Sequence, residues 1–214
     1  MTIIVTGLLV SPRTQSIVLL LEELGLSYEL RTVNMKIGEH QSLDFRMKYN
    51  PFGRVPVFEQ GNTKLFESRA ICRYLAAKYK SPLTPVNVED LGFFEQVESI
   101  VYSHFDTAID NLADEMIFRR NSIHGEIDQR RIDINQGIIT ECLDYYDSIL
   151  GEHEGLAGND FSLVDLFHAP MVKFISSRLG LEHEITSRPN LKAWWERMMS
   201  RSSWETTMAR VTNS

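Results

Sequence analysis

Residues 50–71 read NPFGRVPVFEQGNTKLFESRAI. Within this stretch, 55–59 and 63–66 have the character of two short strands, and Gly61-Asn62 between them is typical of a tight turn. These features predict an antiparallel hairpin. Glu67-Ser68 follows directly and opens a segment whose apolar residues recur at helical spacing, which predicts a helix capped by Ser68.

The sequence before this stretch predicts a β-α-β unit. Residues 2–6, TIIVT, are rich in β-branched side chains and predict a buried strand. Ser11-Pro12 combines a favoured helix cap with a residue favoured at the first helical position, and Gly25 suits the end of that helix. Residues 28–33 predict a second strand, which should be parallel to the first because a helix connects them. After a polar stretch, the hairpin then completes a four-stranded mixed sheet with helices on its faces.

The sequence beyond the third predicted helix changes character. Residues 79–88 hold two prolines and no apolar periodicity, which indicates a linker, and the segments that follow are helical in pattern. The helices expected there are 89–118, 126–150, one from Ser162 to about residue 177 that starts with a capping-box-like pairing to Asp165, and one from Arg188-Pro189. We therefore predict an α/β domain over residues 1–80, a linker over 81–88 and an all-α domain over 89–214.

The composition narrows the classes of function. The chain has 214 residues and a net charge of −7, which argues against a nucleic-acid partner. Two distant cysteines, Cys72 and Cys142, cannot form a disulfide framework, and Cys72 falls on the apolar face of its predicted helix. No apolar run is long enough for a membrane span, and the N-terminus resembles no leader peptide. We expect a cytoplasmic protein without a membrane partner, and no metal site, because the histidines form no ligand cluster.

Three stretches should meet at one edge of the sheet, and the first is Ser11-Pro12. It lies where the first strand ends and the first helix begins, a place that favours ligands and presents free N–H groups with partial positive charge. An anionic sulfur would be stabilised there, and the Ser11 hydroxyl would add one hydrogen bond. The alternative is that Ser11 is only a helix cap.

The other two stretches suit an extended peptide and its amino-acid end. Val55-Pro56 is a candidate cis peptide bond, which would turn the backbone of Val55 outward to pair with a peptide ligand. The Ser68 hydroxyl and nearby N–H groups could bind a carboxylate, and Glu67 could accept from an ammonium group. The alternatives are an ordinary turn proline and plain helix capping.

The order of these elements resembles the glutathione transferases over essentially the whole chain, most closely the phi class. The matching phrases are Gly38-Glu39-His40, residues 50–59, Phe66 to Ile71, Gln96-Val97-Glu98, Phe161 to Leu166 and Arg188-Pro189. The resemblance implies a thioredoxin-like first domain, an all-helical second domain that contributes the site of the electrophile, glutathione as co-substrate, and a cytoplasmic homodimer.

The resemblance also implies roles for individual residues. Ser11 matches the catalytic serine, and the residues implied to bind glutathione are Ser11, Pro12, His40, Gln41, Arg54, Val55, Pro56, Glu67 and Ser68. His40 and Gln41 would hold the glycine end, with Arg54 at a polar position of that site, while Glu67 and Ser68 would hold the γ-glutamyl end. The chain departs from the family pattern at two places: Pro12 removes an N–H and a hydroxyl beside the serine, and His40-Gln41 replaces a more common basic pair.

The function expected from this resemblance is conjugation of glutathione to a small apolar electrophile, with reduction of organic hydroperoxides as a related activity. Phe105, Met116 and Phe118 are candidate walls of the electrophile site, and Phe52 and Arg69 are candidate dimer contacts. Two alternatives remain open: a non-catalytic protein that binds glutathione or another ligand on the same fold, and a biosynthetic enzyme dedicated to one reactive intermediate.

Overall fold

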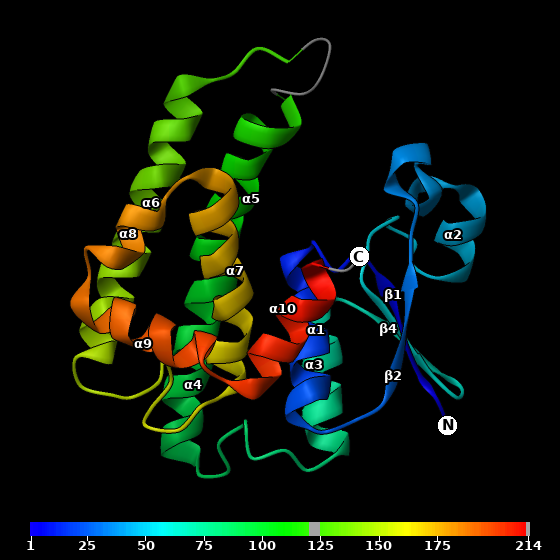
Figure 1. The fold of residues 1–214 in the computed structure, drawn as a ribbon, viewed down its shortest axis with the longest axis horizontal. Coiled ribbons are helices and arrows are strands. Elements are labelled where there is room, and N and C mark those ends of the chain that lie inside the picture. Colours follow the sequence, from blue (N-terminus) through cyan, green and yellow to red (C-terminus); the bar gives the residue numbers. More distant parts are fainter. Residues whose placement is uncertain (120–124, 213–214) are drawn as a thin grey trace. The chain divides into compact units, whose positions relative to one another are not determined.

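The computed structural model describes residues 1–119 and 125–212 of the chain. Contacts divide it into two compact units: the first contains Met1–Pro82 and the C-terminal residues from Met199 onward, and the second contains Leu83–Met198 (Figure 1). Each unit is described by itself below. The sequence-based boundaries instead place residues 81–88 in a linker and residues 199–214 in the helical domain.

The first unit is built on a four-stranded mixed sheet, as predicted. Its strands are β1 (Ile3–Gly7), β2 (Tyr28–Thr32), β3 (Val57–Gln60) and β4 (Thr63–Phe66), in the order β2-β1-β3-β4. β1 and β2 run parallel, whereas β3 is antiparallel to both β1 and β4. This arrangement confirms the β-α-β unit and the hairpin that the sequence predicts.

Helices cover both faces of this sheet. α1 (Pro12–Glu23) and α3 (Ser68–Lys78) pack against each other, and Phe58 of β3 meets Tyr74 of α3 with ring centroids 5.7 Å apart. On the opposite face, Val57 packs with Val33 and with Phe45 of the short helix α2 (Leu43–Lys48). Figure 1 shows α2 on the other side of the strands from α1 and α3. The polar stretch at 34–50 therefore contains structure that its sequence did not indicate, namely α2 and two 3₁₀ turns, Met35–Ile37 and Glu39–Gln41.

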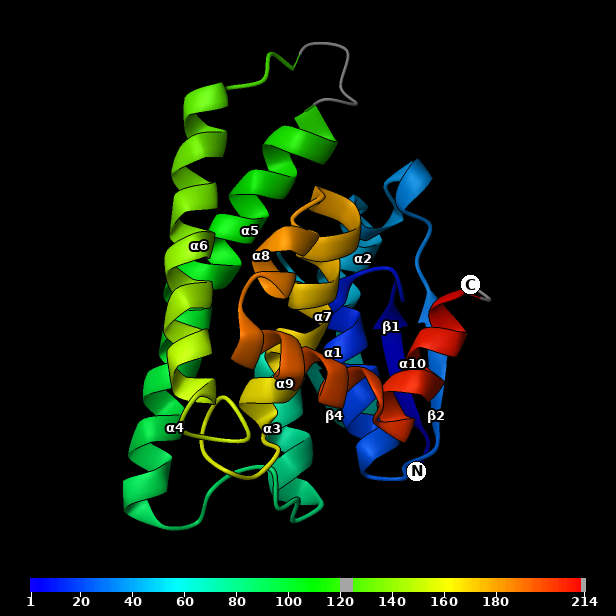
Figure 2. The same ribbon diagram turned by 60° about the vertical axis from the view of Figure 1, so that its left-hand side comes forward.

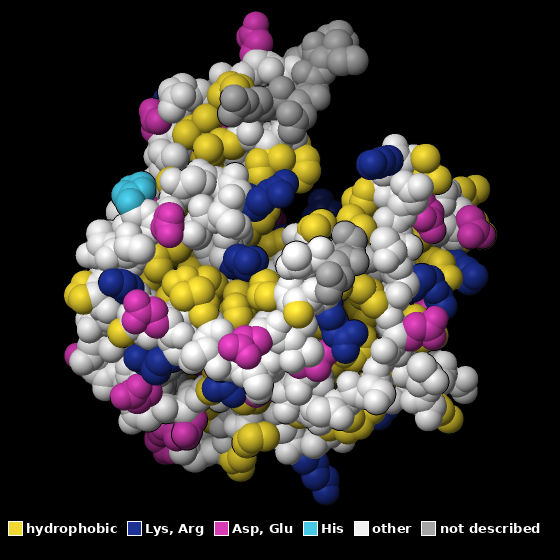
Figure 3. Space-filling view, in the orientation of Figure 1, with side chains coloured by type: hydrophobic (Ala, Val, Ile, Leu, Met, Phe, Trp, Pro, Cys, Tyr) yellow, Lys and Arg dark blue, Asp and Glu magenta, His cyan; other side chains and the backbone are white. Residues whose placement is uncertain are grey.

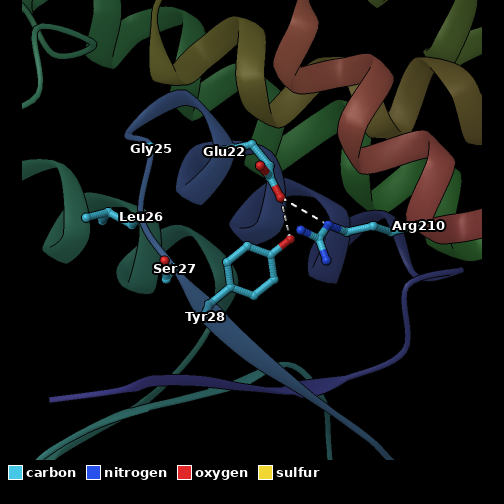
Figure 4. Close-up of a pocket in the computed structure, with 6 residues that line it drawn as sticks. All are labelled: Glu22, Gly25, Leu26, Ser27, Tyr28 and Arg210. Carbon is cyan, nitrogen blue, oxygen red and sulfur yellow. Dashed lines mark hydrogen bonds and ion pairs between the residues drawn. The ribbon is translucent and has the colours of Figure 1, made fainter.

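The last helix, α10 (Ser202–Thr212), packs against α1 within the first unit. Arg201 and Ser203 both donate to the carboxylate of Glu23, the arginine at 2.8 and 2.9 Å. The neighbouring Glu22 accepts from Tyr28 at 2.7 Å and from Arg210 at 3.1 Å, as Figure 4 shows. Two adjacent glutamates at the C-terminal end of α1 thus hold α10 against α1 through hydrogen bonds and ion pairs.

The Glu23 contact predicts a loss of stability in acid. Burial alone would raise the pKa of Glu23, but hydrogen bonds from Arg201 and Ser203 and the arginine's charge lower it below its usual value of 4.5. Because the folded pKa is depressed, this stabilisation is present above pH 4.5 and is lost as the pH falls through the folded pKa. Glu23→Gln should lower the unfolding free energy by about 1 kcal/mol at neutral pH, roughly 2–4 °C in Tm, and the difference should shrink in acid. Thermal unfolding followed by circular dichroism at both pH values measures this.

Glu29→Gln is the matched control, because Glu29 is an exposed glutamate of the same unit. It should change Tm little at either pH. A Glu23→Gln deficit that persists undiminished well below pH 4.5 would contradict the proposed ionisation.

The second unit is helical throughout its regular structure. Its elements are α4 (Val88–Ile100), a π-helical turn (Val101–Phe105), α5 (Asp106–Ala113), a second π-helical turn (Asp114–Arg119), α6 (Gln129–Leu150), α7 (Leu163–Leu179), α8 (Glu182–Thr186) and α9 (Pro189–Met199). α4, α5 and the two turns follow one another without a break, as expected for one long helix over 89–118, and Figure 2 shows α5 beside α6. The α/β-then-all-α fold class is therefore confirmed.

A buried capping box starts α7. Asp165 is 1% exposed, and its two carboxylate oxygens accept from the N–H groups of Leu156 and Ser162, from the Ser162 hydroxyl and from the Trp194 indole, at 2.8–2.9 Å. Ser162 in turn accepts from the N–H of Val164. The Ser162–Asp165 pairing predicted from the sequence is thus confirmed, and it also joins α9 to the loop that precedes α7.

Candidate functional site

The sheet register brings the three predicted stretches to one edge. Thr6 near the end of β1 pairs with Val57 at the start of β3, and Val57 pairs with Phe66 at the end of β4. Gly7 pairs with Thr32 at the end of β2. The segments that leave β1, β2 and β4 and the segment that enters β3 therefore all emerge at the same edge of the sheet.

Ser11 occupies the N-cap position of α1, with Pro12 as the first helical residue. The backbone N–H of Ser11 donates to Leu8 at 3.0 Å, but its side chain makes no capping hydrogen bond. Its half-buried hydroxyl thus stands at the positive end of a helix dipole without being used as a cap. The side-chain capping that the sequence left open as an alternative is therefore not formed, and a ligand role for Ser11 stays a prediction.

The peptide bond between Val55 and Pro56 is cis, as the sequence predicts. The turn before it is held by Asn50, a buried side chain that accepts from the N–H of Phe52 at 3.0 Å and donates to the carbonyl of Arg54 at 2.9 Å. The Val55 side chain packs on the Val33–Phe45–Val57 cluster. Backbone pairing of Val55 with a peptide ligand stays a prediction.

The Glu67-Ser68 corner differs from the expectation in one detail. Ser68 is the first residue of α3, and the N-cap is Glu67, with φ 71° and ψ 108°. A positive φ is uncommon for a residue other than glycine, and such conformations cluster at functional sites. Expecting Ser68 as the cap was therefore wrong by one position, because the chain makes its sharp bend at Glu67. The Glu67 side chain is exposed and Ser68 is half-buried.

His40 and Gln41 lie in the second 3₁₀ turn, beside the turn that contains Gly53. Gln41 Nε2 donates to the carbonyl of Gly53 at 2.7 Å, and Arg46 of α2 donates to Gln41 Oε1. His40 Nδ1 is buried and has no hydrogen-bond partner among the residues that the structure describes. The amide of Gln41 is thus engaged at both ends by the protein itself, while Arg54 is exposed.

Arg46 is a residue that the sequence reasoning missed. It lies in the polar stretch whose helix was not predicted, so the sequence analysis did not place its side chain beside Gln41. Arg46 belongs to no sequence motif that would mark it as a binding residue. Phe45, the neighbouring residue of α2, packs against the sheet. Its apolar side chain within a polar stretch is the signal that could have located this helix, and Arg46 with it.

The residues predicted for other roles have the following positions. Phe105 is fully buried, with its ring centroid 5.5 Å from those of both Tyr146 and His168. It is a core residue of the helical unit, and this position does not favour its predicted role as a wall of the electrophile site. Met116 is half-buried and Phe118 is 66% exposed.

The two candidate dimer contacts differ in exposure. Phe52 is 65% exposed, with its ring against the edge of Phe66 at 6.1 Å, and Arg69 is half-buried. The surface around α2 is apolar beside charged groups, as the upper right of Figure 3 shows.

Within residues 1–119 and 125–212, no group of three or more His, Cys, Asp or Glu side chains is arranged to hold a metal ion. Over the same residues, none of the helices has the length and hydropathy needed to span a membrane. Cys72 is fully buried, and this burial raises the pKa of its thiol.

Known proteins resemble both parts of the chain in sequence. Residues 1–77 match the family described as glutathione S-transferase, N-terminal domain, and residues 103–202 match glutathione S-transferase, C-terminal domain. The chain is 35% identical over 203 residues to glutathione S-transferase PM239X14 of Arabidopsis thaliana, covering 91% of this chain and 90% of that protein. It is 32% identical over 197 residues to glutathione S-transferase F10 of the same plant, covering 90% of each.

Solved structures of glutathione transferases resemble this chain in fold. Poplar glutathione transferase F1 superposes with a TM-score of 0.90 at 27% identity, over 100% of both chains. Glutathione S-transferase I from maize, solved with an atrazine glutathione conjugate, has a TM-score of 0.85 at 28% identity, again over 100% of both. Sequence and fold therefore give one answer over nearly the whole length: the chain belongs to the glutathione S-transferase family, and its relatives include phi-class members.

Proposed function

We propose that this protein conjugates glutathione to small apolar electrophiles, and that Ser11 holds the glutathione sulfur as a thiolate. The observation that carries the proposal is the Ser11 hydroxyl, which stands at the N-terminus of α1 and makes no capping bond there. A donor at that position stabilises negative charge and lowers the pKa of a bound thiol. Ser11 acts as a hydrogen-bond donor to the sulfur and not as a base, because its own hydroxyl is too weakly acidic.

The sheet edge suits glutathione bound in an extended form. Val55, beside the cis proline, would pair with the backbone of the cysteinyl residue. Glu67 and Ser68 would hold the γ-glutamyl end, the first accepting from the ammonium group and the second donating to the carboxylate. The segment that contains His40 would face the glycine end. Anchoring both ends would fix the sulfur near Ser11, which lowers the entropic cost of the reaction.

The chemical step is nucleophilic substitution or addition. The bound thiol loses its proton to solvent, and the thiolate forms a carbon–sulfur bond to the electrophile. Where the electrophile carries a leaving group, that group departs with its bonding electrons. The same thiolate would reduce an organic hydroperoxide, with two glutathione molecules oxidised to the disulfide. The helical unit contributes to the electrophile site in this proposal, with Met116 and the exposed Phe118 as candidate walls.

The proposal includes a cytoplasmic homodimer. Phe52 is the first proposed contact, because its large apolar ring is exposed in a loop and would be buried against a second copy. Arg69 is the second proposed contact. A single monomeric peak in size-exclusion chromatography at micromolar concentration would refute the dimer.

Two assays test the main proposal. The purified chain should be retained on immobilised glutathione and released by free glutathione, and it should then conjugate glutathione to an aromatic halide above the uncatalysed rate. Retention without turnover would replace the proposal with the ligand-binding alternative. Failure in both assays would show that this chain neither binds nor conjugates glutathione.

A further inference from the structure

The starting observation is that each end of the Gln41 side-chain amide forms a hydrogen bond to another group of the protein. Its Nε2 donates to the carbonyl of Gly53 at 2.7 Å, and its Oε1 accepts from Arg46. These two bonds fix the orientation of the amide, and although Nε2 keeps a second N–H, the neutral amide offers a carboxylate no positive charge. The side chain that Gln41 orients, Arg46, carries a positive charge instead.

Gly53 shows how closely these groups fit. It adopts φ +62°, a left-handed conformation that favours glycine. A Cβ at this position would lie 2.8 Å from the carbonyl oxygen of His40 and 3.0 Å from both Arg46 Nε and Gln41 Oε1. The guanidinium of Arg46 therefore rests directly against the turn that leads into Val55-Pro56.

Distance along the chain places this guanidinium near the glycine end of the proposed ligand. Gly53 and Val55 are two residues apart, so their Cα atoms are separated by at most about 7.6 Å. A peptide paired with Val55 through its cysteinyl residue would extend by roughly 3.3 Å to the next residue. With the γ-glutamyl end held at Glu67-Ser68, that next residue is the glycine, and it points toward the segment that contains His40.

Charge also singles out Arg46. Among the residues that the structure describes, no carboxylate forms an ion pair with it, and the oxygen of Gln41 is neutral. Glu39, the nearest acidic residue of the 3₁₀ turn, is used to accept from the N–H of Asn34 at 2.7 Å. Arg46 is thus an oriented guanidinium with its charge uncompensated, which is the group that best recognises a carboxylate.

We propose that Arg46 binds the glycine carboxylate of glutathione, and that Gln41 is the positioning residue that orients it. The inference rests on the proposed function. It replaces Gln41 as the direct contact expected from the sequence, and it accounts for the absence of a basic residue at position 41. Arg54 is the competing cation, but no hydrogen bond of its guanidinium orients it within the described part of the chain, so it is less preorganised than Arg46.

The test compares two ligands on the full-length protein: glutathione and its glycine monoethyl ester, which lacks the charge of the glycine carboxylate. Isothermal titration calorimetry gives a Kd for each. The wild type should bind glutathione about tenfold more tightly than the ester, and the ratio should fall with added salt. Arg46→Gln should bring the ratio close to one by weakening glutathione alone, and Arg46→Lys should keep part of it.

Two further variants separate the roles. Gln41→Leu should also lower the ratio, although Arg46 is still present, whereas Arg54→Gln should leave the ratio unchanged. A merely structural defect would weaken both ligands equally and leave the ratio intact. A wild-type ratio in Arg46→Gln, or a ratio lost only in Arg54→Gln, would overturn the inference while glutathione binding itself stands. A wild type that binds neither ligand would instead overturn the proposed function, and the inference with it.

Discussion

Ser11→Ala is expected to lower the rate of conjugation by about 100-fold or more, the usual cost of removing one hydrogen-bond donor from a developing or bound anion. The loss should come with a change in pH dependence. Without the hydroxyl the thiolate is less favoured, so the pKa of bound glutathione should rise by roughly 1–2 units, the equivalent of one charge-assisted hydrogen bond. Ultraviolet absorbance of the thiolate, titrated against pH in the complex, measures this shift.

The folded state should tolerate Ser11→Ala, because the hydroxyl makes no capping bond that the substitution would remove. Ser16→Ala is the matched control: its hydroxyl belongs to the same helix and donates to the carbonyl of Pro12 at 3.2 Å. The control should leave the rate within about twofold and the thiol pKa unchanged. If Ser11→Ala keeps both the wild-type rate and the wild-type titration, the thiolate does not depend on Ser11.

Asp165→Ala should lower the unfolding free energy by about 3–5 kcal/mol, the largest effect expected from any single substitution in the helical unit. The substitution removes both oxygens of a carboxylate that accepts four hydrogen bonds. It leaves the N–H groups of Leu156 and Ser162 and the indole of Trp194 without their acceptor. Denaturant unfolding followed by tryptophan fluorescence measures the loss, since Trp194 is itself one of the donors.

Asp165→Asn and Asp160→Ala complete this experiment. The asparagine keeps the shape but turns one acceptor into an NH₂ that faces donors, so it should recover only part of the stability. Asp160 is an exposed aspartate of the same loop, and its replacement should cost less than about 0.5 kcal/mol. Equal losses for Asp165→Ala and Asp160→Ala would contradict the role assigned to the buried carboxylate.

The sequence predicts the sheet and most helices because their signals are local. The hairpin follows from Gly61-Asn62 and its flanking strands, and the start of α1 follows from Ser11-Pro12. The start of α7 follows from the Ser162–Asp165 spacing. In each case a few neighbouring residues fix the backbone without help from distant parts of the chain.

The features that the sequence did not predict depend on tertiary contacts. α2 is short and polar, and its position depends on Phe45 packing against Val57 of β3. Phe105 lies in an apolar helix that could face either a core or a ligand, and only its packing against Tyr146 and His168 places it in the core. The contact between Gln41 and Arg46 likewise joins two elements that the sequence did not show to be neighbours.

The docking of α10 onto α1 has a consequence for how the protein is made. Residues 14–21 of α1 are all buried, five of them apolar (residues 17–21), and part of the cover of this helix comes from the far end of the chain. During translation, residues 1–82 leave the ribosome long before α10 does. The surface of α1 that α10 covers therefore stays exposed while the helical unit is synthesised. A ribosome-bound intermediate of this protein should therefore be a better chaperone client than its finished form, and an excised N-terminal fragment should aggregate.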